Sequence, residues 1–172
     1  HHANRVKKQA QKLLDSHATD WELEHNNIQQ LLLASCVLHE VGLLLSYKYH
    51  AQHSAYILKH ADLPGFDQAE RQLLVLLVQY YKGDIDPEAL TEISLVSEKI
   101  VYRLLIIVRL SAVLCRRRRD DVLPDYHTRV SDSNIELCLP ENWLSTHPLL
   151  ADELLQENNQ LAKLGYYLAI QC

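Results

Sequence analysis

Hydrophobic spacing predicts that the first two thirds of the chain are helical. Apolar residues recur at the i, i+4, i+7, i+8 spacing of an amphipathic helix at Val6, Ala10, Leu13 and Leu14. A second helix is expected from about residue 27 to 45 and a third over about 50–60. The second of these is apolar on nearly every side, so it is expected to be central.

Turn and cap signals place the later helices. The stretch 62–66 contains Pro64-Gly65 and predicts a turn. Asp67 followed by Glu70 has the D-x-x-E spacing of a capping box, and it predicts a helix that continues to about Tyr81. A short helix with Pro87 in its first turn and a long apolar helix over about 95–118 follow.

The pattern changes in the last fifty residues. Two short strands are expected at 126–130 and 135–139, joined by the turn residues 131–134. A helix begins at Pro148 and ends before Gly165, and a closing strand follows it. The predicted fold is mainly α, with a helical domain over 1–119 and a small α+β module of β-β-α-β order over 120–172.

Charge supports this division and excludes several classes of protein. Residues 1–119 carry 15 Lys and Arg against 13 Asp and Glu, whereas residues 120–172 carry 2 against 9. An apolar fraction of 48% with a net charge of −5 excludes disorder. The longest apolar run, 31–38, is far shorter than the ~20 residues of a membrane span. The negative balance and the lack of a recognition-helix pattern argue against DNA binding.

The cysteine and methionine content bears on the cellular compartment and on whether the chain is part of a longer polypeptide. No two of the four cysteines form a C-x-x-C pair, and Cys36 and Cys115 lie inside apolar runs, so free thiols and a reducing cytoplasm are expected. The chain contains no methionine, which indicates a piece of a longer polypeptide. Its four glycines are isolated from one another, so no phosphate-binding glycine loop is predicted.

Arginine and histidine supply the candidate phosphate ligands. The basic cluster consists of Arg116, Arg117, Arg118 and Arg119, and guanidinium groups bind phosphate oxygens bidentately. His53 and His60 are seven residues apart and are expected on one helix face, with His50 near it, and His50 and His53 are added as candidate phosphate contacts. The alternative is a solvated helix end beside histidines that have ordinary polar partners.

A metal site is a weaker candidate. His2, with Arg5 after it, and the doublet His39-Glu40 together resemble the HD superfamily of helical phosphohydrolases, in which histidines and aspartates bind a divalent metal. The doublet here carries glutamate, and the long helix has no carboxylate after Lys99, with Ser111-Ala112 where an aspartate is expected. Arg103 and Arg109 flank that position and are expected to oppose a cation. No metal is therefore assigned, and His2, His39 and Glu40 stay weak candidates.

Taken in order, the motifs resemble the C-terminal region of the exopolyphosphatase and guanosine pentaphosphate phosphohydrolase (Ppx/GppA) family. The motifs that carry the resemblance are Leu38-His39-Glu40-Val41-Gly42-Leu43, His53-Ser54-Ala55-Tyr56-Ile57-Leu58, Asp62-Leu63-Pro64-Gly65-Phe66, Arg117-Arg118-Arg119-Asp120-Asp121, Leu139-Pro140, Trp143-Leu144 and His147-Pro148. They span nearly the whole chain. The stretch Gln79-Tyr80-Tyr81-Lys82 departs from a basic cluster that the family often shows, and this favours a shorter substrate.

The resemblance implies an HD-like helical domain that is not catalytic alone. It implies catalysis and Mg²⁺ binding in N-terminal actin-like domains, no cofactor in this part, a homodimer, and polyphosphate or guanosine pentaphosphate as ligand. The latter substrate would connect the parent enzyme to the stringent response. Two alternatives stay open: an autonomous metal-dependent HD phosphohydrolase that uses His2, His39 and Glu40, and a purely structural dimerisation module.

Overall fold

The computed structural model describes residues 2–44, 48–116 and 123–171. Its elements, in chain order, are α1 (His2–His17), α2 (Asn26–Leu38), the 3₁₀ turn η1 (Val41–Leu44), α3 (His50–His60), α4 (Gln68–Tyr80), α5 (Pro87–Leu90), α6 (Glu98–Leu114), β1 (His127–Val130), β2 (Asn134–Cys138), the 3₁₀ turn η2 (Leu144–Thr146), α7 (Pro148–Ala162) and β3 (Tyr167–Gln171). The predicted class, mainly α with a small α+β module, is confirmed.

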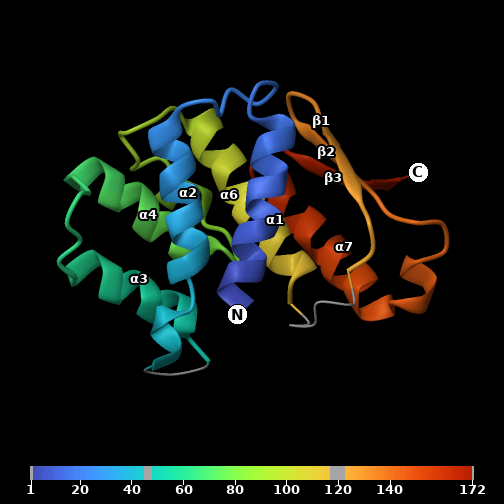
Figure 1. The fold of residues 1–172 in the computed structure, drawn as a ribbon, viewed down its shortest axis with the longest axis horizontal. Helices are drawn as coiled ribbons and strands as arrows, with labels where there is room; N and C mark the ends of the chain where they lie inside the picture. The colour runs from blue at the N-terminus through green and yellow to red at the C-terminus, as the bar shows by residue number, and fades with distance from the viewer. Residues whose placement is uncertain (1, 45–47, 117–122, 172) are drawn as a thin grey trace.

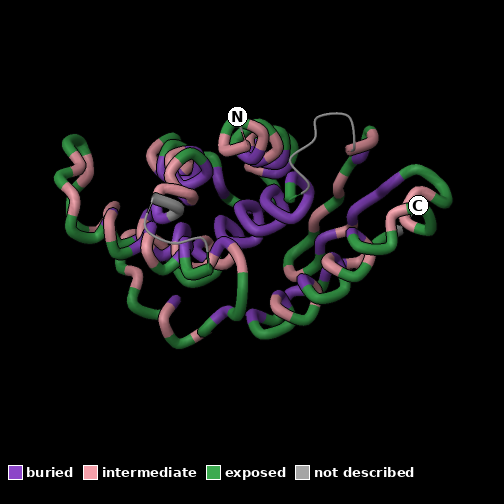
Figure 2. Tube along the Cα trace, turned by 90° about the horizontal axis from the view of Figure 1, so that it is seen from below, coloured by how far each residue is buried: buried purple, intermediate pink, exposed green. Residues whose placement is uncertain are grey.

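Helix α6 is the centre of the molecule. Every residue from Arg103 to Leu114 is buried, and α6 packs against α1, α2, α4 and α7. Helices α3 and α4 lie on one side of this core, and the sheet with α7 lies on the other (Figure 1). Viewed along the perpendicular direction, buried residues concentrate in the middle of the bundle while the outer turns are exposed (Figure 2). Side chains from both predicted parts, such as Leu104 and Leu137, belong to one continuous hydrophobic cluster.

Several local signals act as the sequence predicts. The Asp67 side chain accepts from the Glu70 backbone N–H, and Glu70 accepts from the Asp67 backbone N–H, which completes the capping box of α4. Pro87 occupies the first turn of α5 behind the Asp86 cap. The apolar residues predicted to face the core from α1 are all buried.

Two predicted helices are too long. Helix α2 ends at Leu38 rather than near residue 45, because the His39 ring donates from Nδ1 to the carbonyl of Cys36 and a 3₁₀ turn then begins at Val41. Helix α6 ends at Leu114 rather than near 118, with Cys115 as its C-cap. Apolar residues continue after Leu38 and extended the first prediction, whereas the second was extended into the arginines at 116–118.

The C-terminal module is a three-stranded sheet covered by α7. Strands β1 and β2 pair antiparallel, and β2 and β3 pair parallel. A parallel pair needs a crossover connection, and η2 with α7 provides it. Of the cysteines, Cys36 and Cys115 are buried thiols outside any disulfide, as expected, but Cys138 on β2 is disulfide-bonded, so the expectation of free thiols is wrong there.

Two buried arginines on α6 connect the helices to this module. Arg109 makes a bidentate pair with Glu157 of α7, at 2.7 and 3.0 Å, and also donates to the carbonyls of Tyr80 and Gly83. Arg103 donates to Asp132 in the β1–β2 turn and to the carbonyl of Trp21. Carboxylates and carbonyls thus engage both cations, and their opposition to a metal stays a prediction.

Candidate functional site

Three metal-ligating side chains meet at one end of the bundle. His2 Nε2 lies 3.3 Å from Glu40 Oε1, and His39 Nε2 lies 3.4 Å from the same oxygen. One potential ligand atom from each residue lies within 4.8 Å of the others, and in the part of the chain that the structure describes this is the one cluster of its kind. The sequence candidates His2, His39 and Glu40 are thus brought together.

The local fold explains this convergence. Helix α1 supplies His2 from its first turn, while His39 and Glu40 follow the last residue of α2. Figure 1 shows the start of α1, the end of α2 and η1 at the same end of the molecule. The Ser54 hydroxyl on α3 donates to the carbonyl of His39 at 3.0 Å and accepts from the Gly42 N–H at 2.6 Å, so it anchors the doublet on both sides.

His50 lies in the interior next to this cluster. Its Nε2 shares a hydrogen bond with the hydroxyl of Tyr81, and the Tyr81 ring packs edge-on against His39 with centroids 4.5 Å apart. The side chain of His50 is buried, whereas His53 on the same helix is half-buried. Phosphate contact by His50 or His53 stays a prediction.

Arg116 lies just beyond the end of α6. Its guanidinium is exposed and lies 3.6 Å from the carboxylate of Glu153 on α7. Arg117, Arg118 and Arg119 lie outside the described residues. Phosphate binding by the four arginines also stays a prediction.

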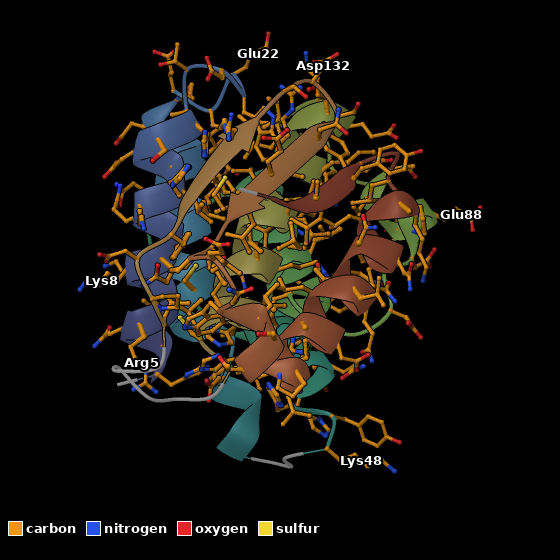
Figure 3. All side chains as sticks on the ribbon, turned by 90° about the vertical axis from the view of Figure 1, so that its right-hand side faces the viewer. Arg5, Lys8, Glu22, Lys48, Glu88 and Asp132 are labelled. Carbon is orange, nitrogen blue, oxygen red and sulfur yellow. The ribbon has the colours of Figure 1, made fainter. Side chains whose placement is uncertain are left out.

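Helix α1 carries a basic face that the sequence analysis did not single out. Lys7, Lys8 and Lys12 are exposed and line an open groove with four polar or acidic residues of the same helix: Asn4, Gln11, Asp15 and Ser16. Arg5 and Lys8 lie along α1 at the end of the molecule that also carries Lys48, far from Glu22 (Figure 3). The spacing of the lysines in the sequence could have predicted this basic face, because residues three to four apart share a helix face.

Two buried groups near α1 have shifted pKa values. Burial lowers the pKa of His17 below its ordinary value, and the nearby charge of Asp20 opposes this only in part. His17 is therefore neutral at pH 7, where it hydrogen-bonds to Thr128 of β1. Burial raises the pKa of the Cys36 thiol to about 12, so this cysteine is protonated and a poor nucleophile at neutral pH.

Helix α6 offers no carboxylate near the cluster. Glu98 in its first turn is the one acidic residue of the helix, and Ser111 is fully buried. Among the described residues the Ser111 hydroxyl has no hydrogen-bond partner. The protein ligands that the described part of the chain can offer at this end are therefore the two histidines and Glu40.

Comparison with known proteins agrees with this architecture. Residues 1–158 match the family model described as Ppx/GppA phosphatase, domain III. The chain therefore belongs to the Ppx/GppA phosphatase family, which confirms the resemblance. It is 38% identical over 168 residues to a guanosine-5'-triphosphate,3'-diphosphate pyrophosphatase of Pseudoalteromonas translucida (strain TAC 125), with 98% of this chain covered. The match spans 34% of that relative's length. Among the described helices, none is long and apolar enough to cross a membrane.

Proposed function

We propose that this chain is the C-terminal auxiliary part of a Ppx/GppA phosphohydrolase and that it binds polyanionic substrate without hydrolysing it. Catalysis, with Mg²⁺, belongs to N-terminal actin-like domains of the same polypeptide. The observation that carries the proposal is the match to domain III together with the 34% coverage of the relative. A cytoplasmic homodimer that acts on polyphosphate or guanosine pentaphosphate is part of this proposal.

Charge distribution supports polyanion binding at the end of the molecule where α1 begins. Lys7 and Lys8 are exposed there, and Arg116 follows the end of α6, which runs alongside α1. Cations that contact phosphates release bound counterions, so the affinity falls as salt rises. The overall charge of −5 makes a local cluster of cations the feature that can attract a polyanion.

Exposed apolar side chains support a dimer. Leu149 and Leu155 of α7 are each 63% exposed, and Tyr167 and Ile170 project from β3, which is an edge strand of the sheet. An edge strand offers unpaired backbone groups to another chain. This surface belongs to α7 and β3 of the C-terminal module.

Polyphosphate binding should be salt-sensitive and should depend on the basic end. We expect the Lys7→Ala/Lys8→Ala double variant, and separately the replacement of Arg116, Arg117, Arg118 and Arg119 by alanine, to weaken binding of long-chain polyphosphate. Each contacting cation that is removed should reduce the slope of log affinity against log salt by about one unit. Fluorescence anisotropy with labelled polyphosphate over a salt series measures this slope.

The matched control is Lys99→Ala. Lys99 pairs with Glu22 at 2.6 Å at the opposite end of the bundle, so its replacement removes a positive charge without touching the basic end. It should leave the slope unchanged. Equal affinities for the wild type and both basic-end variants would contradict the proposal and favour a purely structural dimerisation module.

A further inference from the structure

We propose that His2, His39 and Glu40 bind a divalent transition-metal ion of the Zn²⁺ class. The inference does not depend on polyanion binding, because it rests on the arrangement of three side chains from α1 and the α2–η1 connection.

The distances from Glu40 to the two histidines fit the coordination of one metal ion. Tetrahedral Zn²⁺ with bonds of about 2.0–2.1 Å separates its ligand atoms by roughly 3.3–3.4 Å. Glu40 Oε1 lies 3.3 Å from His2 Nε2 and 3.4 Å from His39 Nε2. Charge-assisted N–H···O bonds are shorter, about 2.7–2.9 Å. Both separations therefore match two edges of a coordination tetrahedron.

Hydrogen bonding sets His39 in the tautomer that a metal requires. The carbonyl of Cys36 accepts from His39 Nδ1 at 2.6 Å, and since a carbonyl can only accept, the hydrogen of the neutral ring is on Nδ1. Nε2 then carries the lone pair and faces Glu40. A histidine ligand whose second nitrogen donates to a backbone carbonyl is the usual outer-shell arrangement around protein metals.

Packing fixes the orientation of the His39 ring in the absence of a metal ion. The ring is 1% exposed and packs against Tyr81, whose hydroxyl is engaged by His50. The His39 carbonyl is tied to Ser54. His2 and Glu40 have side chains that are 14% and 16% exposed, so an ion can reach the cluster from solvent without unfolding it.

The donor set selects the class of metal. Two imidazole nitrogens with one carboxylate suit Zn²⁺, Co²⁺ or Fe²⁺, whereas Mg²⁺ prefers oxygen ligands and retains its waters. Three protein ligands leave at least one coordination position for water or a phosphate oxygen. The site would therefore hold an ion that can also contact an anionic ligand at this end of the bundle.

Titration of tag-free, chelator-stripped protein tests the site. We expect isothermal titration calorimetry to show one equivalent of Zn²⁺ bound per chain, and Co²⁺ to develop the visible absorption bands of a four- or five-coordinate site. Mg²⁺ should not compete at equal concentration. Neither readout requires enzyme activity, so failure of the catalytic assignment would not affect them.

Variants distinguish metal binding at this cluster from adventitious metal binding by other histidines of the chain. Glu40→Gln keeps the shape of the side chain and removes the anionic ligand, and it should weaken Zn²⁺ binding by at least about 10- to 100-fold. His39→Ala should do the same, with circular dichroism confirming that it folds. His60→Ala, at an exposed histidine of α3, should leave affinity unchanged.

Two results would overturn the proposal. One is the absence of stoichiometric Zn²⁺ or Co²⁺ binding in the wild type. The other is binding that survives in Glu40→Gln with the same affinity and the same Co²⁺ spectrum, because the ion would then be held elsewhere.

Discussion

Replacing Arg109 by alanine is expected to lower the free energy of unfolding by about 3–5 kcal/mol. Arg109 and Glu157 have side chains that are 2% and 5% exposed, so the substitution leaves a buried carboxylate without its cation. It also removes the donors to the carbonyls of Tyr80 and Gly83. For a domain of this size the melting temperature should fall by roughly 6–20 °C in a thermal melt followed by circular dichroism.

Arg116→Ala is the matched control for this prediction. Arg116 follows the same helix, but its pair with Glu153 is 3.6 Å long and exposed, so stability should change by about 0.5 kcal/mol or less. The double variant Arg109→Met/Glu157→Leu should be more stable than Arg109→Ala, because no unpaired charge stays buried. An Arg109→Ala melt within 2 °C of the wild type, a margin set by the roughly 2–4 °C expected per kcal/mol, would contradict this role for the pair.

Replacing Gly42 by alanine is expected to cost about 3–5 kcal/mol through steric overlap. A Cβ on Gly42 would overlap the backbone carbonyl of His50 and the backbone N–H of Ser54, and it would lie 2.7 Å from Ser54 Oγ. Backbone atoms cannot move aside as a flexible side chain does. The turn would have to separate from α3 and lose the hydrogen bond from Gly42 to Ser54. Urea unfolding followed by tryptophan fluorescence measures the loss.

Gly65→Ala separates this steric cost from the conformational cost of replacing glycine. Gly65 has φ +89, but a Cβ there meets no atom within 4 Å. Its replacement should cost only about 1–2 kcal/mol, from the left-handed backbone. If Gly42→Ala lowered the free energy of unfolding no more than Gly65→Ala does, that result would contradict the close approach of η1 to α3.

Much of the fold was predictable because its signals are local. The capping box at Asp67, the start of α5 at Pro87 and the turn residues 131–134 each act through neighbouring backbone groups, and all are present. The β-β-α-β order followed from a change of hydrophobic period and from turn residues.

The failures come from contacts between distant parts of the chain. After the end of α2 at Leu38, Gly42 of η1 lies against the backbone of α3, and the pattern of apolar residues in the sequence does not predict that contact. Arg103 and Arg109 were interpreted as cations that flank a metal position, but their partners Asp132 and Glu157 lie 29 and 48 residues away. Pairing across such separations is not visible in a single sequence.

The residues of the candidate site were predictable from the sequence, but the orientation of His39 was not. Sequence resemblance pointed to His2, His39 and Glu40, and the structure brings them together. The orientation of His39 depends on Cys36, Ser54 and Tyr81, and it emerged only from the packing of α2, η1 and α3.

The measurement that tests the central claim most directly is a phosphate-release assay on the 172-residue chain. Polyphosphate and guanosine pentaphosphate are each offered with Mg²⁺ and with Mn²⁺, at protein concentrations high enough to detect weak turnover. An auxiliary domain predicts no release above the chelated control, whether or not a metal binds at His39 and Glu40. Metal-dependent release that His39→Ala abolishes would contradict that claim and identify the chain as a phosphohydrolase in its own right.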